Sequence, residues 1–397
     1  MEGTWPPVSS ETHKWEYDPD ELVLIPRSRR CKILPTYEAA VPASIAQRDV
    51  LISPELALRI SEVEVALARF DQGQAARRYA LPALLLRSES SSSSQIERLT
   101  SSARNVALAE LSDKAPANAL LIAGNVAAMR EALSQRGDMT IDSICAIHDV
   151  LMRGTGEELG LRSEQVWIGG APYSPHGASF VPPHAARVRA CLEDLVAFGA
   201  REDIMPVVKA ALFHAQFETI HPFTDGNGRT GRALLHRMLA NDEVLQHVML
   251  PVSAGLLHDV DRYMAALNAY HEGLVEPVVE CLADALELSV VIGTKTASAV
   301  DGVLARWSEA NTDRSGAASH RLPALLVEQP VVDVAFVAAR LGITDRAARN
   351  LVDVACERGI LSKMGNARRG AFYQAPELIA VLEEASSLRG IRRIAAR

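Results

Sequence analysis

Apolar residues recur every three or four positions over most of the chain, which is the spacing of amphipathic helices. The first clear run consists of Leu56, Ile60, Val63, Leu67 and Phe70. The same spacing continues through Ser101–Leu111, Ala117–Leu133 and Thr140–Met152. Strand-like alternation of apolar and polar residues is nearly absent before residue 320. The pattern therefore predicts a mainly α-helical bundle.

Two stretches depart from this helical spacing. Residues 1 to about 45 are polar and rich in proline, and we interpret them as an irregular arm. Val166–Gly170 and Ser179–Pro183 are short and β-prone, and they flank a turn rich in glycine, proline and serine. This combination predicts a small β-hairpin that projects from the helices.

Two polar segments have the composition of linkers. Ser88–Ser94 indicates a flexible linker, although a serine directly before the helical pattern of Gln95–Leu99 is also a good N-cap. Glu309–Gly316 lacks any apolar period and indicates a second linker. We therefore expect an N-terminal helical region (1–112), a central core domain (113–308), a last domain (318–382) and a C-terminal tail (383–397).

The last domain has its own order of elements. Leu322–Val327, Asp333–Leu341 and Asp345–Glu357 have helical patterns, and Ile360-Leu361 and Ala371–Tyr373 have strand patterns. Helix, turn, helix and hairpin is the order of a winged helix-turn-helix domain.

Several basic residues of that domain lie where phosphate contacts to DNA are usual, namely Arg346, Arg349, Lys363, Arg368 and Arg369. Asp345, Asp353 and Glu357 reduce the local positive charge. DNA and a protein partner therefore both remain candidates for this domain.

Composition narrows the class of protein. The 397 residues carry 41 Lys+Arg against 49 Asp+Glu, a net charge of −8, which argues against a protein that coats nucleic acid. No apolar run is long enough for a membrane span, and the N-terminus lacks the features of a signal peptide. The five cysteines are scattered and odd in number, which disfavours a disulfide framework. We expect a cytoplasmic protein without a membrane partner.

The densest group of reactive side chains lies between two helical patterns, in His221-Pro222-Phe223-Thr224-Asp225-Gly226-Asn227-Gly228-Arg229-Thr230-Gly231-Arg232. Pro222 disfavours helix at the residue before it, so a helix ends here, and another begins within the segment. The free N–H groups of a new helix favour an anion, and Gly226 and Gly228 allow close approach of a ligand to the backbone.

The side chains of this segment suit phosphate chemistry. Arg229 and Arg232 lie on one helix surface and offer fork-shaped donors for phosphate oxygens. Asp225 offers hard oxygens for Mg²⁺, and His221 can accept a proton near neutral pH. These are the parts needed for phosphoryl or nucleotidyl transfer.

Three other interpretations of the segment are weaker. Gly226-x-Gly228-x-x-Gly231 matches the dinucleotide-binding fingerprint, but that motif follows a β-strand, and here a helix precedes it. A G-x-x-x-x-G-K-[ST] phosphate loop does not occur in the chain. A simple helix-capping loop would explain Gly226 and Asn227 but not His221, Asp225 and the two arginines together.

The segment resembles the signature H-x-F-x-[DE]-G-N-G-R-x-x-R of Fic-domain proteins at every fixed position. Phe217–Ile220 and Val166–Gly170 resemble that family too, and the likeness spans about residues 35–295. Most proteins of this kind are adenylyltransferases, which move AMP from ATP onto a hydroxyl of a target protein. The resemblance implies a Fic-fold helical bundle with a small β-hairpin flap, ATP as co-substrate and Mg²⁺ as cofactor.

The resemblance also implies roles for the signature residues. His221 would deprotonate a Ser, Thr or Tyr hydroxyl, and Asp225 would hold the metal. The nucleotide would be bound by Asp225, Gly226, Asn227, Gly228, Arg229, Thr230, Gly231 and Arg232, with Phe223 as an anchor of the loop. Relatives that phosphorylate carry lysine in place of Gly228, so this glycine favours nucleotidyl transfer.

Outside the signature, the resemblance assigns two further regions. The predicted hairpin corresponds to the family's flap, where a target segment would dock by strand addition against Trp167, Ile168, Gly169, Phe180 and Val181. Tyr263 and Met264 correspond to adenine-pocket positions, and His271 lies where many relatives have asparagine. His214, two helical turns before His221, is either half of a metal pair or a packed helix histidine, and we favour the second interpretation.

A built-in inhibitor is implied by the pattern [ST]-x-x-x-E-[GN] of class II Fic proteins. Ser93 and Glu97 match it, whereas Arg98 replaces Gly or Asn. In the family this glutamate pairs with the second arginine of the signature, here Arg232, and an arginine held by a carboxylate cannot also hold the γ-phosphate. Glu97 could equally orient a water that removes AMP from a modified target.

A DNA-binding regulator whose core senses nucleotide is a second class of function for the whole chain. Homo-oligomerisation also stays open.

Overall fold

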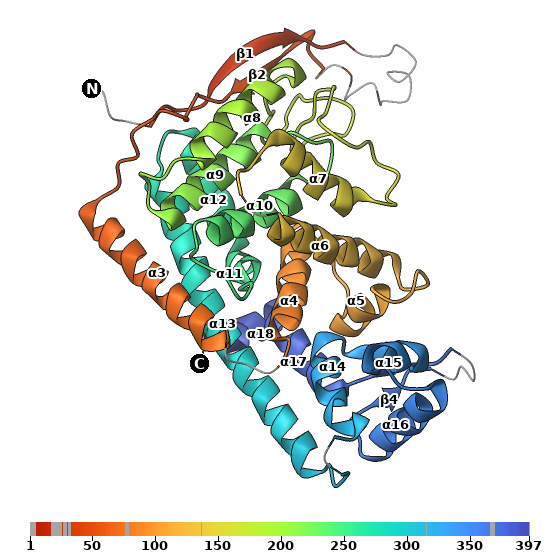
Figure 1. Ribbon diagram of the computed structural model, residues 1–397. Helices are drawn as coiled ribbons and strands as arrows, with labels where there is room; N and C mark the ends of the chain where they lie inside the picture. Colours follow the sequence, from red (N-terminus) through yellow and green to blue (C-terminus); the bar gives the residue numbers. More distant parts are fainter. Residues whose placement is uncertain are drawn as a thin grey trace.

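The computed structural model describes residues 5–16, 26, 30, 33–75, 79–135, 137–314, 316–365 and 370–396. Its described part is mainly helical, which confirms the predicted fold class (Figure 1). The central helices are α6 (Ala117–Ser134), α7 (Ile141–Met152), α8 (Ala185–Gly199), α9 (Pro206–Ile220), α10 (Asn227–Asn241), α11 (Val252–His258) and α12 (Val260–His271). The long helix α13 (Glu276–Glu309) runs from this bundle to the C-terminal region.

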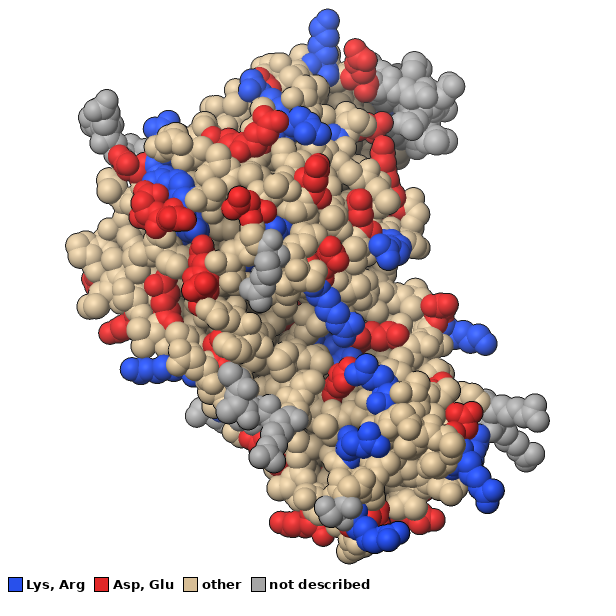
Figure 2. All heavy atoms as spheres, viewed as in Figure 1, with Lys and Arg blue, Asp and Glu red and all other residues tan. Residues whose placement is uncertain are grey.

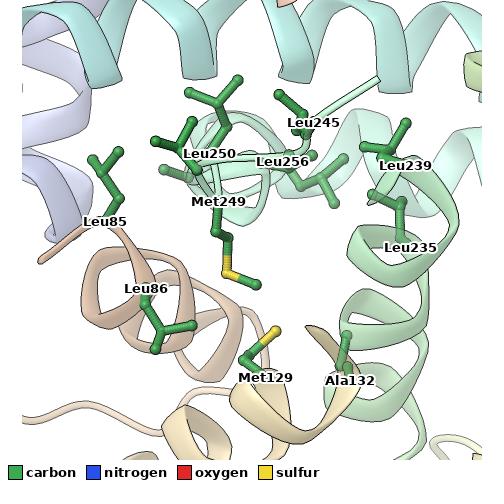
Figure 3. Packing of buried hydrophobic residues seen from close by; sticks show 14 of the residues in the cluster. Leu85, Leu86, Met129, Ala132, Leu235, Leu239, Leu245, Met249, Leu250 and Leu256 are labelled. Atoms are coloured by element: carbon green, nitrogen blue, oxygen red, sulfur yellow. The ribbon is translucent and has the colours of Figure 1, made fainter. Parts of the chain in front are cut away.

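Helices α9 and α10 form the centre of the bundle and pack against each other. Nearly every residue of both is buried, because α10 also contacts α4, α6 and α7, and α9 also contacts α8 and α13. Leucine and methionine side chains fill the space where α4, α6, α10 and α11 meet (Figure 3). The segment 221–226 between α9 and α10 is therefore held on a rigid support.

The N-terminal region contains a β-hairpin, so the predicted irregular arm is wrong for these residues. β1 (Ser9–Lys14) pairs antiparallel with β2 (Thr36–Val41), with Ser9 opposite Val41. Tyr37 and Ala39 of β2 are buried, whereas Glu38 between them is exposed. The alternation is confined to one short strand, and its partner lies more than twenty residues away, so the sequence pattern did not reveal it. Helix α3 (Pro54–Ala75) follows and lies along α13.

The serine-rich segment is neither a linker nor a helix N-cap, which corrects both interpretations. It forms the body of α4 (Leu81–Ile96), and Ser88 through Ser94 are buried. One face of α4 packs on the central bundle and another on the C-terminal helix α17. Serine side chains are small enough for this close approach, and the buried Ser88 Oγ donates to Ala385 O (2.9 Å). Helix α5 (Ala103–Ala109) follows.

The C-terminal region contains the predicted helix, turn, helix and hairpin. The elements are a 3₁₀ turn (Ala318–His320), α14 (Leu322–Glu328), β3 (Val331–Asp333), α15 (Val334–Leu341), α16 (Asp345–Glu357), β4 (Ser362–Lys363) and β5 (Phe372–Gln374). The sheet order is β3-β5-β4, and both pairs are antiparallel. Strand β3 was not predicted, and β4 begins directly after the predicted strand Ile360-Leu361. Arg368 and Arg369 lie outside the described residues.

The last two helices return to the bundle. α17 (Pro376–Ser386) contacts α4 and α13, and α18 (Leu388–Ala395) contacts α11 and α13. The expected domain boundary after residue 382 therefore falls inside α17, and the predicted tail is a packed helix. Acidic and basic side chains are interspersed over the face seen in Figure 2. Within the described ranges, no helix combines the length and apolarity that crossing a bilayer requires.

Candidate active site

The loop between α9 and α10 begins at His221 in a left-handed conformation. Its φ of 49° is rare for a residue other than glycine, and it turns the chain out of α9 just before Pro222. The loop ends at Gly226, whose φ is 77°. A Cβ there would lie 3.0 Å from both Leu151 Cδ2 and Met152 Sδ of α7, so glycine is required by conformation and by space.

Phe223 and Asn227 close the loop on itself. The backbone N–H of Phe223 donates to Asn227 Oδ1 (2.9 Å), and Asn227 Nδ2 donates to Phe223 O (2.8 Å). The Phe223 ring stacks on His148 with ring centroids 3.7 Å apart. His148 Nε2 also lies 3.0 Å from Asp225 O. Because these two bonds hold the Asn227 side chain within the loop, its backbone N–H at the start of α10 is a donor available to a bound anion.

His221 has the features of a general base. Burial lowers the pKa of this histidine to about 4, and the positive charge of Arg162 adds to the effect. The imidazole is therefore neutral near pH 7. Its Nδ1 lies 3.4 Å from Glu218 O, which favours a proton on Nδ1 and leaves the lone pair on Nε2.

The first two turns of α10 carry both signature arginines, and each already has a carboxylate partner. Arg229 Nη2 donates to Asp225 Oδ2 (3.1 Å). Arg232 donates to Ser93 Oγ (2.8 Å), Ser93 O (2.9 Å) and Glu97 Oε1 (2.9 Å). The Arg232 side chain is 2% exposed, whereas that of Glu97 is 42% exposed. The structure thus brings together Ser93, Glu97 and Arg232.

Glu97 also covers the helix N-terminus itself. A Cβ placed on Gly228 would collide with Glu97 Oε1 and would lie 2.8 Å from Arg232 Nη1. The carboxylate therefore occupies the space in front of the second residue of α10, where an anion bound at the helix N-terminus would lie.

A buried polar cluster lies behind the arginine. His214 Nε2 is 2.7 Å from Tyr263 OH, and Glu218 Oε1 lies 3.9 Å from His214 Nε2. Burial lowers the pKa of His214 to about 3 and raises the pKa of Glu218 to about 7. His214 is thus a packed histidine, in line with the interpretation favoured from sequence.

The three expected adenine-pocket residues lie on α12 in different surroundings. Tyr263 is 2% exposed and bonded to His214, whereas Met264 is 43% exposed. His271 stacks on Phe180 of the hairpin with ring centroids 4.4 Å apart, and its Nε2 lies 3.1 Å from Thr219 Oγ1. Only Met264 has a largely open side chain.

The predicted hairpin is present as isolated bridges rather than as regular strands. Ile168 pairs with Phe180, and Ile168 N donates to Phe180 O (2.8 Å). Trp167 Nε1 donates to Ala171 O (2.8 Å), and Val181 O accepts from Ala40 N of β2 (2.9 Å). Among the described residues, no backbone bond engages the amides of Trp167 and Gly169.

Two residues that support the loop were missed from sequence. His148 packs under Phe223, and Arg162 donates to His221 O (2.8 Å) from a buried position. Neither lies in a motif that the sequence analysis singled out, and a lone histidine or arginine in a helix or loop gives no signal of such a role.

Asp225 is the residue that fits a magnesium ion. Its carboxylate is 59% exposed, and only Oδ2 is bonded to Arg229. Hard carboxylate oxygens suit Mg²⁺, which often binds one protein carboxylate together with substrate phosphates. In the part of the chain that is described, no group of three or more His, Cys, Asp or Glu side chains forms a metal site.

Comparisons with known proteins agree with this geometry. The sequence model of the Fic/DOC family matches residues 138–239. The "Probable protein adenylyltransferase aq_aa38" of Aquifex aeolicus is 32% identical over 130 residues, which cover 32% of this chain and 36% of that protein. The "Protein adenylyltransferase fic-1" of Caenorhabditis elegans is 30% identical over 161 residues, or 39% and 29% of the two chains. The match thus spans about a third of the length of these relatives.

A solved structure extends the likeness of the fold. A Fic family protein from Desulfovibrio desulfuricans superposes with a TM-score of 0.55 at 23% identity, covering 82% of this chain and 97% of that one. At this identity the match concerns the fold. The family match includes the signature loop, so residues 138–239 of this chain are similar to the Fic/DOC family in sequence and to a Fic family protein in fold.

Proposed function

We propose that this protein is an adenylyltransferase that moves AMP from ATP to a hydroxyl of a target protein and of itself. The observation that carries the proposal is the neutral His221 beside the N-terminus of α10, with Arg229 and Arg232 on that helix. The names of the relatives, protein adenylyltransferases, support the same activity.

The proposed reaction is an in-line displacement at the α-phosphorus. The free N–H groups of Gly228 and its neighbours bind phosphate oxygens at the helix N-terminus, and Arg229 and Arg232 hold the polyphosphate. The target oxygen attacks phosphorus as its proton passes to His221 Nε2, and the bond to the bridging oxygen breaks to release pyrophosphate. Asp225 would hold Mg²⁺, whose charge offsets that of the phosphates.

Autoinhibition is the second part of the proposal. Glu97 holds Arg232 and stands in front of Gly228, so a triphosphate must displace this carboxylate to gain both contacts. The negative charge of Glu97 also repels the phosphates. The wild-type protein is therefore weakly active, and loss of Glu97 activates it.

The hairpin supplies the docking edge for the target. The amides of Trp167 and Gly169 have no backbone partner among the described residues, so an extended target segment can add there as a strand. Main-chain pairing of this kind demands little of the target sequence.

Intact-protein mass spectrometry tests the proposal. Glu97→Gly protein incubated with ATP and Mg²⁺ gains one or more AMP groups, and the Glu97→Gly/His221→Ala double variant gains none. An unmodified Glu97→Gly protein, or equal modification of the double variant, contradicts the proposal.

The reverse reaction is a second candidate, since one Glu97 oxygen holds Arg232 while the side chain stays 42% exposed and can orient a water. Release of AMP from a pre-modified target by wild-type protein but not by Glu97→Gln identifies it.

DNA binding by the C-terminal region is a third candidate, because Arg346 and Arg349 are exposed at the start of α16. A salt-sensitive gel shift that Arg346→Ala/Arg349→Ala abolishes supports it, and no shift at low salt excludes it.

A further inference from the structure

Arg162 lies between the loop that carries His221 and the hairpin, and it bonds to both. Its Nε donates to His221 O (2.8 Å), and Nη2 donates to Ile220 O (3.4 Å). Nη1 donates to Glu164 O (2.9 Å), just before the first hairpin segment, and Nη2 donates to Pro183 O (2.5 Å), at the end of the second. Its backbone N–H donates to Pro222 O (3.0 Å).

The surroundings of this arginine are unusual for a cation. Arg162 is 4% exposed, and every acceptor of its side chain is a backbone carbonyl. Among the described residues, the Arg162 guanidinium bonds to backbone carbonyls and to no carboxylate. Burial lowers the pKa of its guanidinium to about 10. Burying a charge without a counter-ion costs free energy. The planar guanidinium offsets this cost through its fixed set of five N–H donors, which bind several carbonyls at once.

Arg162 stabilises the left-handed backbone conformation of His221, which turns the catalytic loop out of α9. His221 has a φ of 49°, and a left-handed residue without glycine's freedom persists only where its surroundings fix it. Arg162 fixes it from the carbonyl side, while His221 N donates to Phe217 O (2.9 Å) at the end of α9.

We propose that Arg162 is a positioning residue for AMP transfer, which sets the direction of the His221 imidazole and ties the catalytic loop to the base of the hairpin. The inference rests on the proposed function. The inference extends the proposed function because it links the catalytic base His221 to the hairpin surface where the target docks.

The charge of Arg162 has a separate effect on His221. Burial and the charge of Arg162 lower the pKa of the imidazole, whereas the backbone of Glu218 and the charges of Glu97 and Asp225 raise it. Removing the positive charge therefore raises this pKa, and a replacement that keeps the charge does not.

Two replacements in the Glu97→Gly background separate the geometric effect from the charge effect. Arg162→Lys keeps the charge, but one ammonium cannot serve four carbonyls that surround a planar fork. Arg162→Gln removes both charge and fork. For each variant, the rate of self-modification is measured against ATP concentration and pH, and thermal melting checks the fold. Arg187→Gln is the control, since Arg187 is 45% exposed and forms its ion pair with Glu11 rather than with any acceptor of Arg162.

Both Arg162 variants should lose about 10- to 100-fold in the rate at saturating ATP, because misplacing a base affects the chemical step. The ATP concentration for half-saturation should stay within about twofold, because that binding is made by α10. Only Arg162→Gln should move the acidic limb of the pH profile to higher pH. Arg187→Gln should match the parent.

Two results overturn the inference. One is an unchanged maximal rate in folded Arg162→Lys or Arg162→Gln. The other is a fall in rate that is matched by an equal-fold rise in the ATP concentration for half-saturation, with the same pH profile in Arg162→Lys and Arg162→Gln. If Arg162→Gln does not fold, Arg162→Lys decides by its maximal rate. Failure of the proposed function itself is distinct, because the Glu97→Gly parent would then show no modification at all.

Discussion

Glu97 and Gly228 touch across two helices that are more than 130 residues apart in the chain: the glutamate carboxylate lies where a side chain at position 228 would begin. The same carboxylate accepts from Arg232 Nη2 at 2.9 Å. One side chain thus takes both the space and one cationic partner that a triphosphate needs at the start of α10. Glu97 makes this contact from the C-cap of α4, which ends at Ile96.

Replacing Glu97 by glycine should tighten ATP binding about tenfold, because a half-exposed charge pair contributes roughly 1 kcal/mol and its loss also removes repulsion. Isothermal titration calorimetry with ATP and Mg²⁺ measures the change in Kd. Glu97→Gln, which keeps the volume but not the charge, should give an intermediate Kd. Equal affinities in all three proteins would show that Glu97 does not compete with the nucleotide.

Replacing Arg98 by glycine should strengthen the inhibition. Arg98 follows α4 with a φ of 61°, and Leu99 N donates to Ser94 O (2.9 Å) as in a left-handed helix cap. Glycine takes this conformation without strain, so the free energy of unfolding should rise by about 1 kcal/mol and self-modification should fall. Urea unfolding and mass spectrometry measure the two effects.

Arg98→Ala is the control, since it removes the same side chain and keeps the strained backbone. Equal unfolding free energies for Arg98→Gly and Arg98→Ala would contradict this explanation. The same geometry accounts for glycine or asparagine at this position of the class II pattern, which Arg98 departs from.

The opposite face of α4 gives a third prediction. Ser88 Oγ donates to Ala385 O (2.9 Å), and Ser92 Oγ donates to Ser386 O (3.3 Å), both on α17. Ser88→Ala/Ser92→Ala leaves two buried carbonyls with fewer donors and should cost about 1–3 kcal/mol of unfolding free energy. The looser α4 should raise self-modification in the presence of Glu97.

Ser90→Ala is a matched control on the same helix, because Ser90 Oγ is buried without a hydrogen-bond partner among the described residues. It should leave stability and activity nearly unchanged. If Ser90→Ala activates the protein as much as the double variant does, the contact between α4 and α17 does not hold the inhibitor.

A fourth prediction concerns pH and Glu218. Burial raises the pKa of this carboxyl to about 7, against the opposing charge of Arg232. The folded protein therefore keeps the proton between about pH 4.5 and 7 while the unfolded chain loses it. The stability that the protonated group contributes is complete below pH 4.5 and is lost as pH rises through 7.

Glu218→Gln keeps the shape and removes the titration. Its free energy of unfolding, relative to wild type, should increase by about 1–3 kcal/mol between pH 5 and pH 8. Urea unfolding at the two pH values measures it, and the histidines cancel because both proteins contain them. A difference that does not vary with pH would contradict the protonated state of Glu218.

Local signals were sufficient to predict helices α6, α7, α9 and α10 and the loop between the last two. Pro222 marks the end of α9, and Gly226 marks the start of α10, so the positions of His221 and Arg229 followed from sequence. The resemblance to the class II pattern implied that Glu97 pairs with Arg232, and the structure pairs them at 2.9 Å.

Other parts depend on contacts that a local pattern does not reveal. A run of serines is polar and a poor helix former, yet Ser88–Ser94 is helical because packing on two sides outweighs propensity. Arg162 is indistinguishable in sequence from a surface arginine, and its role follows only from the carbonyls that the folded chain places around it.

The most direct test of the central claim is to give Glu97→Gly protein ATP labelled at the α-phosphate or, separately, at the γ-phosphate. Attack by a hydroxyl on the α-phosphorus, with His221 as base, predicts stable label on the protein from the α-position and none from the γ-position. It also predicts no label when His221 is replaced by alanine. Label from the γ-phosphate, or α-label that persists without His221, would contradict the account.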